Sequence, residues 1–131
     1  MKTLEFAYAH RLLRYSGKCQ YLHGHNGRLE VVLRSDHLDE VGFVADFGLI
    51  KETIGEWVQN NLDHRVLLCR KDPLIPMLQE SGQPVFVMDD NPTAENIAKS
   101  IWDSLTDCGL PISEIRLWET STSIATYCGD Q

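Results

Sequence analysis

The sequence contains no apolar run that approaches the roughly 20 residues needed to cross a lipid bilayer. It also contains no apolar stretch of the signal-peptide kind near Met1, no Cys-x-x-Cys pair and no internal repeat. No segment rich in glycine, proline or serine divides the chain. These absences predict a cytoplasmic protein with no membrane partner, folded as a single domain over residues 1–131.

An excess of positive charge is missing as well, because 12 Lys and Arg residues face 19 Asp and Glu residues, a formal net charge of −7. A broad nucleic-acid surface needs a basic stripe, so no nucleic-acid partner is expected. One small basic cluster is present, formed by Arg11, Arg14 and Lys18. It is either ordinary solvated charge or a local site for a small anionic ligand.

Cysteine is scarce, and the four residues are far apart: Cys19, Cys69, Cys108 and Cys128. A chain of 131 residues that is 43% hydrophobic can build a core without disulfides, so all four are interpreted as thiols, three of them as packing residues. Cys19 differs because it lies four residues before His23. It is a reactive thiolate beside a metal, a fourth metal ligand or an inert side chain, and spacing alone leaves all three open.

Period-two alternation of apolar residues predicts two strands near each end of the chain, over residues 3–10, 23–34, 112–119 and 122–128. The short connections within each pair favour hairpins over crossovers. The two pairs are therefore expected to form an antiparallel sheet.

Two helices are predicted between these strand pairs. Asp46 is a suitable N-cap for the first, and residues 91–93 (Asn-Pro-Thr) suit the start of the second. Short strands at 65–69 and 85–88 could add a hairpin, with a proline-rich loop between them. The main order is ββααββ, which predicts an α+β domain whose two helices cover one face of the sheet.

Three histidines lie on the predicted apolar faces of two strands. His23 and His25 are two residues apart and point to one side, and His10 ends the first strand on its apolar face. Three converging imidazoles could hold Zn²⁺ and leave a fourth position open, which is typical of catalytic zinc sites. The alternative is that these side chains only pack or form hydrogen bonds. His37 lies in a polar turn and is assigned to the surface.

Glu119 extends the alternation of Ile115 and Leu117, so it is expected on the buried face, where a carboxylate needs a partner. A ligand edge with several N–H donors would suit it, and a frayed strand end in water is the alternative. Asp63 and His64 follow the first predicted helix. Asp63 could orient His64 for proton transfer, or His64 could simply stabilise the end of the helix.

Six motifs, in order along most of the chain, carry a family resemblance. They are Phe6-Ala7-Tyr8-Ala9-His10, Lys18-Cys19-Gln20-Tyr21-Leu22-His23-Gly24-His25-Asn26, Val44-Ala45-Asp46-Phe47, Leu62-Asp63-His64, Asn91-Pro92-Thr93-Ala94-Glu95-Asn96 and Glu119-Thr120. Together they resemble the family of 6-pyruvoyltetrahydropterin and 6-carboxytetrahydropterin synthases.

The resemblance implies a tunnelling fold (T-fold) and a homo-oligomer built from trimers, commonly a hexamer, with active sites between subunits. It assigns His10, His23 and His25 as zinc ligands. It assigns Cys19 as the catalytic cysteine, with Asp63 and His64 as proton-relay partners. Glu119 would anchor the pterin ring of a small-molecule substrate.

The implied reaction is that of a zinc-dependent lyase in queuosine biosynthesis. It converts 7,8-dihydroneopterin triphosphate to 6-carboxy-5,6,7,8-tetrahydropterin and releases triphosphate and acetaldehyde. The alternatives are 6-pyruvoyltetrahydropterin formation, a zinc- or pterin-binding module without turnover, and a structural zinc domain. Two features depart from the pattern: Gly27 stands where an aromatic usually follows His-Gly-His-Asn, and the segment 68–90 is longer than in compact bacterial members.

Overall fold

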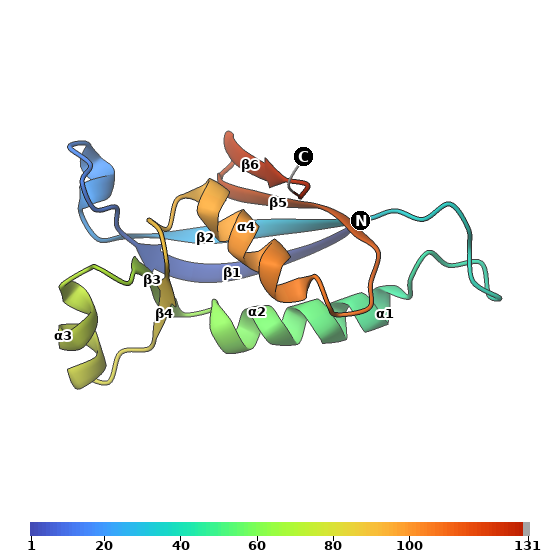
Figure 1. The fold of residues 1–131 in the computed structure, drawn as a ribbon, viewed down its shortest axis with the longest axis horizontal. Coiled ribbons are helices and arrows are strands. Elements are labelled where there is room, and N and C mark those ends of the chain that lie inside the picture. The colour runs from blue at the N-terminus through green and yellow to red at the C-terminus, as the bar shows by residue number, and fades with distance from the viewer. Residues whose placement is uncertain (130–131) are drawn as a thin grey trace.

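The computed structural model describes residues 1–129, and its six strands form one sheet in the order β4-β3-β1-β2-β5-β6 (Figure 1). The strands are β1 (Lys2–His10), β2 (His23–Leu33), β3 (Arg65–Cys69), β4 (Val85–Met88), β5 (Ile112–Thr120) and β6 (Ser123–Tyr127). The helical elements are η1 (Lys18–Gln20), α1 (Phe47–Ile50), η2 (Lys51–Gly55), α2 (Glu56–Asn61), α3 (Leu74–Glu80) and α4 (Ala94–Leu105). The α+β class is confirmed.

The sheet is antiparallel where β1, β2, β5 and β6 pair, as the alternation predicts. The β3 strand runs parallel to both β1 and β4, so the sheet as a whole is mixed. The hairpin expected between residues 65 and 88 is therefore wrong, because α3 connects two parallel strands. The prolines concealed this helix: Pro73 precedes it and Pro76 lies in its first turn, where a missing N–H breaks no helical hydrogen bond.

One face of the sheet forms the core. Strand register places six buried side chains on that face: Phe6, Tyr8, Leu29, Val31, Ile115 and Leu117. The helices cover the same face with two buried stripes: Ile50, Ile54, Val58 and Leu62 from α1 to α2, and Ile97, Ala98, Ile101 and Leu105 from α4. The prediction that two helices cover one face of the sheet is confirmed.

Both predicted helix starts are capped by side chains. The Oδ1 atom of Asp46 accepts a hydrogen bond from the Gly48 amide at 2.7 Å. The Oγ1 atom of Thr93 accepts one from the Asn96 amide at 3.1 Å. Each cap satisfies a backbone donor that has no partner inside the helix. In the part of the chain that the structure describes, no helix has the length and hydrophobicity to cross a membrane.

An ion pair between half-buried Arg11 and buried Asp72 ties the end of β1 to the start of α3. The Asp72 carboxylate accepts hydrogen bonds from Arg11 Nε at 2.8 Å and Nη2 at 2.5 Å, and a third from the Leu74 amide at 2.8 Å. The Arg11 guanidinium, followed by the Leu74 amide, outweighs burial and holds the pKa of Asp72 below its usual value. Arg11 is thus paired with Asp72. The other two residues of the basic cluster, Arg14 and Lys18, are exposed.

We predict that Asp72→Asn lowers the free energy of unfolding by about 1–3 kcal/mol, because it leaves the Arg11 guanidinium poorly paired. Urea unfolding at neutral pH measures this. The wild-type advantage is full above about pH 4, the unfolded pKa of Asp, and is lost as the pH falls through the lower folded pKa.

The matched control is Asp89→Asn, which breaks the exposed pair between Asp89 and Arg70. Its expected cost is about 0–1 kcal/mol, because water replaces an exposed partner easily. Equal losses in the two variants contradict a structural role for the Arg11–Asp72 pair.

Candidate metal centre and active site

Three histidines converge at the end of the core face. His10 lies opposite His23 in the β1–β2 register, and His25 is two residues further along β2 on the same side. One ligand atom from each ring lies within 4.8 Å of the other two. The ring centroids are 4.5 Å apart for His10 and His23, and 5.1 Å apart for each pair that includes His25. The predicted convergence is confirmed.

Backbone carbonyls orient two of these rings. Nδ1 of His10 lies 2.7 Å from the Pro92 carbonyl oxygen, and Nδ1 of His23 lies 2.7 Å from that of Tyr21. A carbonyl only accepts, so each Nδ1 carries the proton and each Nε2 keeps a free lone pair. Burial, against the opposing effects of Pro92 and Glu119, lowers the pKa of His10. The ring therefore stays neutral, the form that binds metals.

The fit to a metal ion rests on one buried atom. Among the described residues, Nε2 of His10 is buried without a hydrogen-bond partner, and a bound cation would satisfy it. The group of mutually close ligand atoms contains only the three histidines in the part that the structure describes, so Cys19 is not a fourth member. Three protein ligands with a free position suit a catalytic rather than a structural metal site.

Glu119, on β5, lies beside the same three histidines. Its Oε1 lies 3.8 Å from His10 Nε2 and its Oε2 lies 4.0 Å from His25 Nε2. Its side chain is 21% exposed, so the carboxylate is not at a frayed end in open water. The Tyr8 hydroxyl donates a hydrogen bond to Oε1 at 3.1 Å. Among the described residues this is the one hydrogen bond that the carboxylate accepts, so its other acceptor positions are available to a ligand with N–H donors.

Tyr8 belongs to this polar group, although the alternation over residues 3–10 indicates only that it lies on the apolar face with His10. Burial, then the charge and hydrogen bond of Glu119, raise the pKa of Tyr8, so its hydroxyl stays protonated and acts as a donor. A signal existed in the sequence, since a buried tyrosine hydroxyl needs a polar partner and Tyr8 shares its face with His10. The identity of that partner needed the register across three strands.

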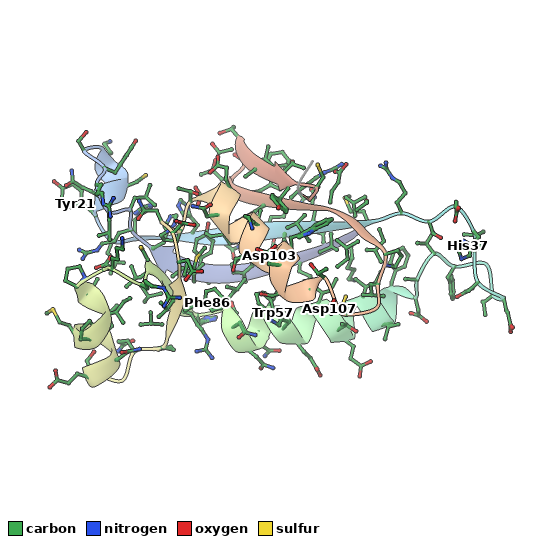
Figure 2. The ribbon with its side chains drawn as sticks, in the orientation of Figure 1. Tyr21, His37, Trp57, Phe86, Asp103 and Asp107 are labelled. Carbon is green, nitrogen blue, oxygen red and sulfur yellow. The ribbon has the colours of Figure 1, made fainter. Side chains whose placement is uncertain are left out.

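Cys19 lies in η1, in the loop that joins β1 to β2 where His10 and His23 face each other. It is half-buried, and its carbonyl accepts a hydrogen bond from the Leu12 amide at 2.9 Å. The chain thus brings Cys19 to the end of the sheet that carries the histidines. Figure 2 shows Tyr21, from the same loop, at the opposite end of the molecule from His37, which lies on an extended loop.

Asp63 and His64 form a pair despite being adjacent in sequence. Asp63 Oδ2 lies 2.9 Å from His64 Nδ1, and Oδ1 accepts a hydrogen bond from the Ala7 amide at 2.9 Å. The left-handed backbone of His64, with φ of 60°, makes this geometry possible. Burial raises the pKa of Asp63, but the bonds from Ala7 and His64 outweigh it and the net pKa is low. The ionised carboxylate holds His64 with Nε2 free.

The His64 ring is 81% exposed, and among the described residues neither it nor Asp63 forms a hydrogen bond with Cys19. The structure therefore brings together the three histidines with Glu119, and separately Asp63 with His64. It does not join these two groups within one chain.

The 6-pyruvoyl tetrahydropterin synthase family model matches residues 1–130. The chain belongs to this family. It is 46% identical over 99 residues to 6-carboxy-5,6,7,8-tetrahydropterin synthase from Rickettsia bellii, covering 74% of this chain and 72% of that protein. It is 35% identical over 126 residues to the protein of that name from Rickettsia felis, covering 91% of each.

Solved structures have the same fold. An uncharacterised protein from Wolinella succinogenes superposes with a TM-score of 0.81 at 23% identity, covering 98% of this chain and 96% of that one. The 6-pyruvoyl tetrahydropterin synthase from Caenorhabditis elegans gives a TM-score of 0.73 at 25% identity, covering 98% and 93%. The T-fold expected from the sequence motifs is thereby confirmed.

We predict that the purified protein binds about one divalent metal ion per chain and that His23→Ala reduces this content at least tenfold, because two imidazoles hold the ion far more weakly than three. Mass spectrometry of the dialysed protein measures the metal content.

Chelation should lower the melting temperature of the wild type and not that of the variant, since a metal ion that binds only the native state stabilises that state. The control is His37→Ala, which removes an exposed histidine; equal metal loss in both variants contradicts the assignment.

Proposed function

We propose that this chain is a zinc-dependent lyase that converts 7,8-dihydroneopterin triphosphate and one water molecule to 6-carboxy-5,6,7,8-tetrahydropterin, triphosphate and acetaldehyde. The observation that carries the proposal is the cluster of three histidines beside the Glu119 carboxylate. Relatives named 6-carboxy-5,6,7,8-tetrahydropterin synthase, at up to 46% identity, favour this product. The queuosine pathway follows as the proposed context.

Substrate binding is assigned to two groups in the pocket. The Glu119 carboxylate accepts hydrogen bonds from the N–H edge of the pterin ring, and the ring then points its side chain toward the histidines. His10, His23 and His25 are the residues that would hold zinc. When bound, the ion supplies Lewis-acid polarisation of the side-chain oxygens of the substrate.

Proton transfer is assigned to Cys19 and His64. A thiolate near a cation is a competent base, and Cys19 is carried by the loop next to the histidines. Asp63 fixes the tautomer of His64, so that Nε2 can accept or donate a proton. Cys19 takes one substrate proton and His64 returns one on the other side. Exposed Arg14 and Lys18 are the candidates for triphosphate contacts.

We assign Asp63 and His64 to the site of a neighbouring subunit in a trimer-based homo-oligomer, commonly a hexamer. The support is the exposure of His64 and its lack of a bond to Cys19 in its own chain. A side chain that is held in one orientation but exposed can contribute to an active site on a neighbouring subunit once the subunits assemble. The oligomer and a cytoplasmic location are parts of this proposal.

Two alternatives make different products or none. The family name and the Caenorhabditis elegans structure point to 6-pyruvoyltetrahydropterin formation, which keeps the three-carbon side chain. A binding module without turnover would keep the metal and the pterin and make nothing. Incubation with dihydroneopterin triphosphate, followed by mass analysis of the pterin and an acetaldehyde assay, separates all three.

We predict that Cys19→Ala lowers kcat at least about a hundredfold, the scale of lost general-base catalysis, and leaves the metal content unchanged. The assay is acetaldehyde release under saturating substrate. Cys108→Ala, which alters a thiol packed against the core, is the matched control and should retain most of the activity. Full activity of Cys19→Ala refutes its assigned role, and absence of acetaldehyde in the wild type refutes the proposed product.

A second prediction concerns the division of the site between chains. Cys19→Ala and His64→Ala should each be nearly inactive. When the two variants are unfolded and refolded together, about a quarter of the sites should combine an intact cysteine with an intact histidine from the neighbouring chain, and these sites should be active. Each variant refolded alone is the control. If the mixture stays inactive while the refolded wild type recovers, both groups act from the same chain.

A further inference from the structure

Tyr8 reaches across a neighbouring strand to a third one. It is on β1, its hydrogen-bond partner Glu119 is on β5, and β2 lies between them. On β2 the residue beneath this crossing is Gly27, which pairs with Phe6 and lies one step before the Arg28–Trp118 pair. The Tyr8 ring therefore passes over the only residue type that has no side chain to obstruct it.

The space above Gly27 is already filled. A Cβ atom placed on Gly27 would lie 2.9 Å from Tyr8 Cε1 and 3.4 Å from two ring atoms of Phe6. Real Cβ atoms do not approach another heavy atom to under 3 Å, so any larger residue at 27 must displace Tyr8. An aromatic ring thus occupies the space beside residue 27 although that residue is a glycine, and the ring comes from Tyr8 of β1.

The Tyr8 ring has little freedom to move. It stacks on Phe6 with centroids 5.1 Å apart and meets His10 edge-on at 5.2 Å. It also contacts the His25 ring at 5.7 Å, and the residue as a whole is 4% exposed. One rigid side chain thus touches two of the three clustered histidines and the carboxylate beside them.

We infer that Tyr8 is a positioning residue that fixes the Glu119 carboxylate at a set distance from the three histidines and thereby selects ligands with a pterin N–H edge. The inference rests on the proposed function. The Tyr8 hydroxyl occupies one lone pair of Oε1, which restrains the carboxylate beside His10 and His25 and leaves its other lone pairs for a ligand. Gly27 is required because it leaves the path of the ring open.

The decisive variant is Tyr8→Phe, which keeps the ring and removes only the hydroxyl. In metal-loaded protein, the Kd for 7,8-dihydroneopterin should rise about tenfold, the effect expected when a hydrogen bond to a charged group is lost. In turnover assays KM should rise in parallel while kcat stays within about twofold, because Cys19 and His64 are untouched. Metal content should not change.

Selectivity supplies a readout that a purely structural role would not move. The corresponding dihydrolumazine carries an oxo group in place of the 2-amino group, so it presents fewer donors to Glu119. The wild type should favour the pterin strongly, and Tyr8→Phe should reduce that preference about tenfold. The control is Tyr127→Phe, on a ring that packs against Trp102 and pairs with Ile115, four residues along β5 from Glu119. It should change neither affinity nor preference.

A double-mutant cycle tests whether Gly27 is required to leave space for the Tyr8 ring. Gly27→Ala should weaken pterin binding by displacing the Tyr8 ring, and the same change in a Tyr8→Ala background should add little, because the ring it displaces is gone. Additive effects of the two substitutions overturn this part.

The outcomes separate the inference from the proposed function. If the wild type binds dihydroneopterin and Glu119→Gln abolishes binding, but Tyr8→Phe binds as the wild type does with unchanged selectivity, only the inference is overturned. If the wild type binds no reduced pterin, the proposed function fails and the inference fails with it.

Discussion

The β1–β2 register is the constraint on which the rest of the structure depends. Pairing of His10 with His23, and of Tyr8 with His25, places every polar pocket residue of these strands on the side that also carries Phe6 and Leu29. A slip of one residue would turn the histidines of one strand to the other face and break both the core and the site. The hydrophobic face therefore enforces the geometry of the polar cluster, and the two cannot vary independently.

This arrangement carries a desolvation cost, because it places polar side chains at the end of the hydrophobic core. Polar groups that lie at the edge of an apolar layer lose water and need partners. Carbonyls of Pro92 and Tyr21 satisfy one nitrogen on each of two imidazoles, and Tyr8 satisfies part of Glu119. Nε2 of His10 is left without a partner in the described chain, so the site is built at the expense of stability that a bound cation would restore.

The strand faces and the helix starts were predictable, because they depend on the alternation of apolar residues and on helix-capping residues. Alternation located the faces of β1, β2 and β5, and Asp46 and Thr93 cap the helices that their positions indicated. The parallel β3–β4 pair was not predictable, because prolines concealed α3 and because strand direction follows from the connection. The Tyr8–Glu119 contact was missed for a related reason: it joins residues 111 positions apart across an intervening strand, and no local pattern encodes it.

The two proton-transfer candidates differ in how the chain supports them. Cys19 depends on a long loop anchored by the same register that aligns His10 with His23, so its position follows the histidine cluster. Asp63 and His64 depend instead on the β1 edge, where the Ala7 amide holds Asp63 and the Ala7 carbonyl accepts from the His64 amide at 2.7 Å. Both anchors use β1, yet Ala7 and His10 point to opposite faces of that strand. One strand thus presents His10 to the three-histidine cluster on one face, while its backbone at Ala7 holds the exposed Asp63–His64 pair. In the proposed assembly this leaves His64 accessible to a neighbouring chain.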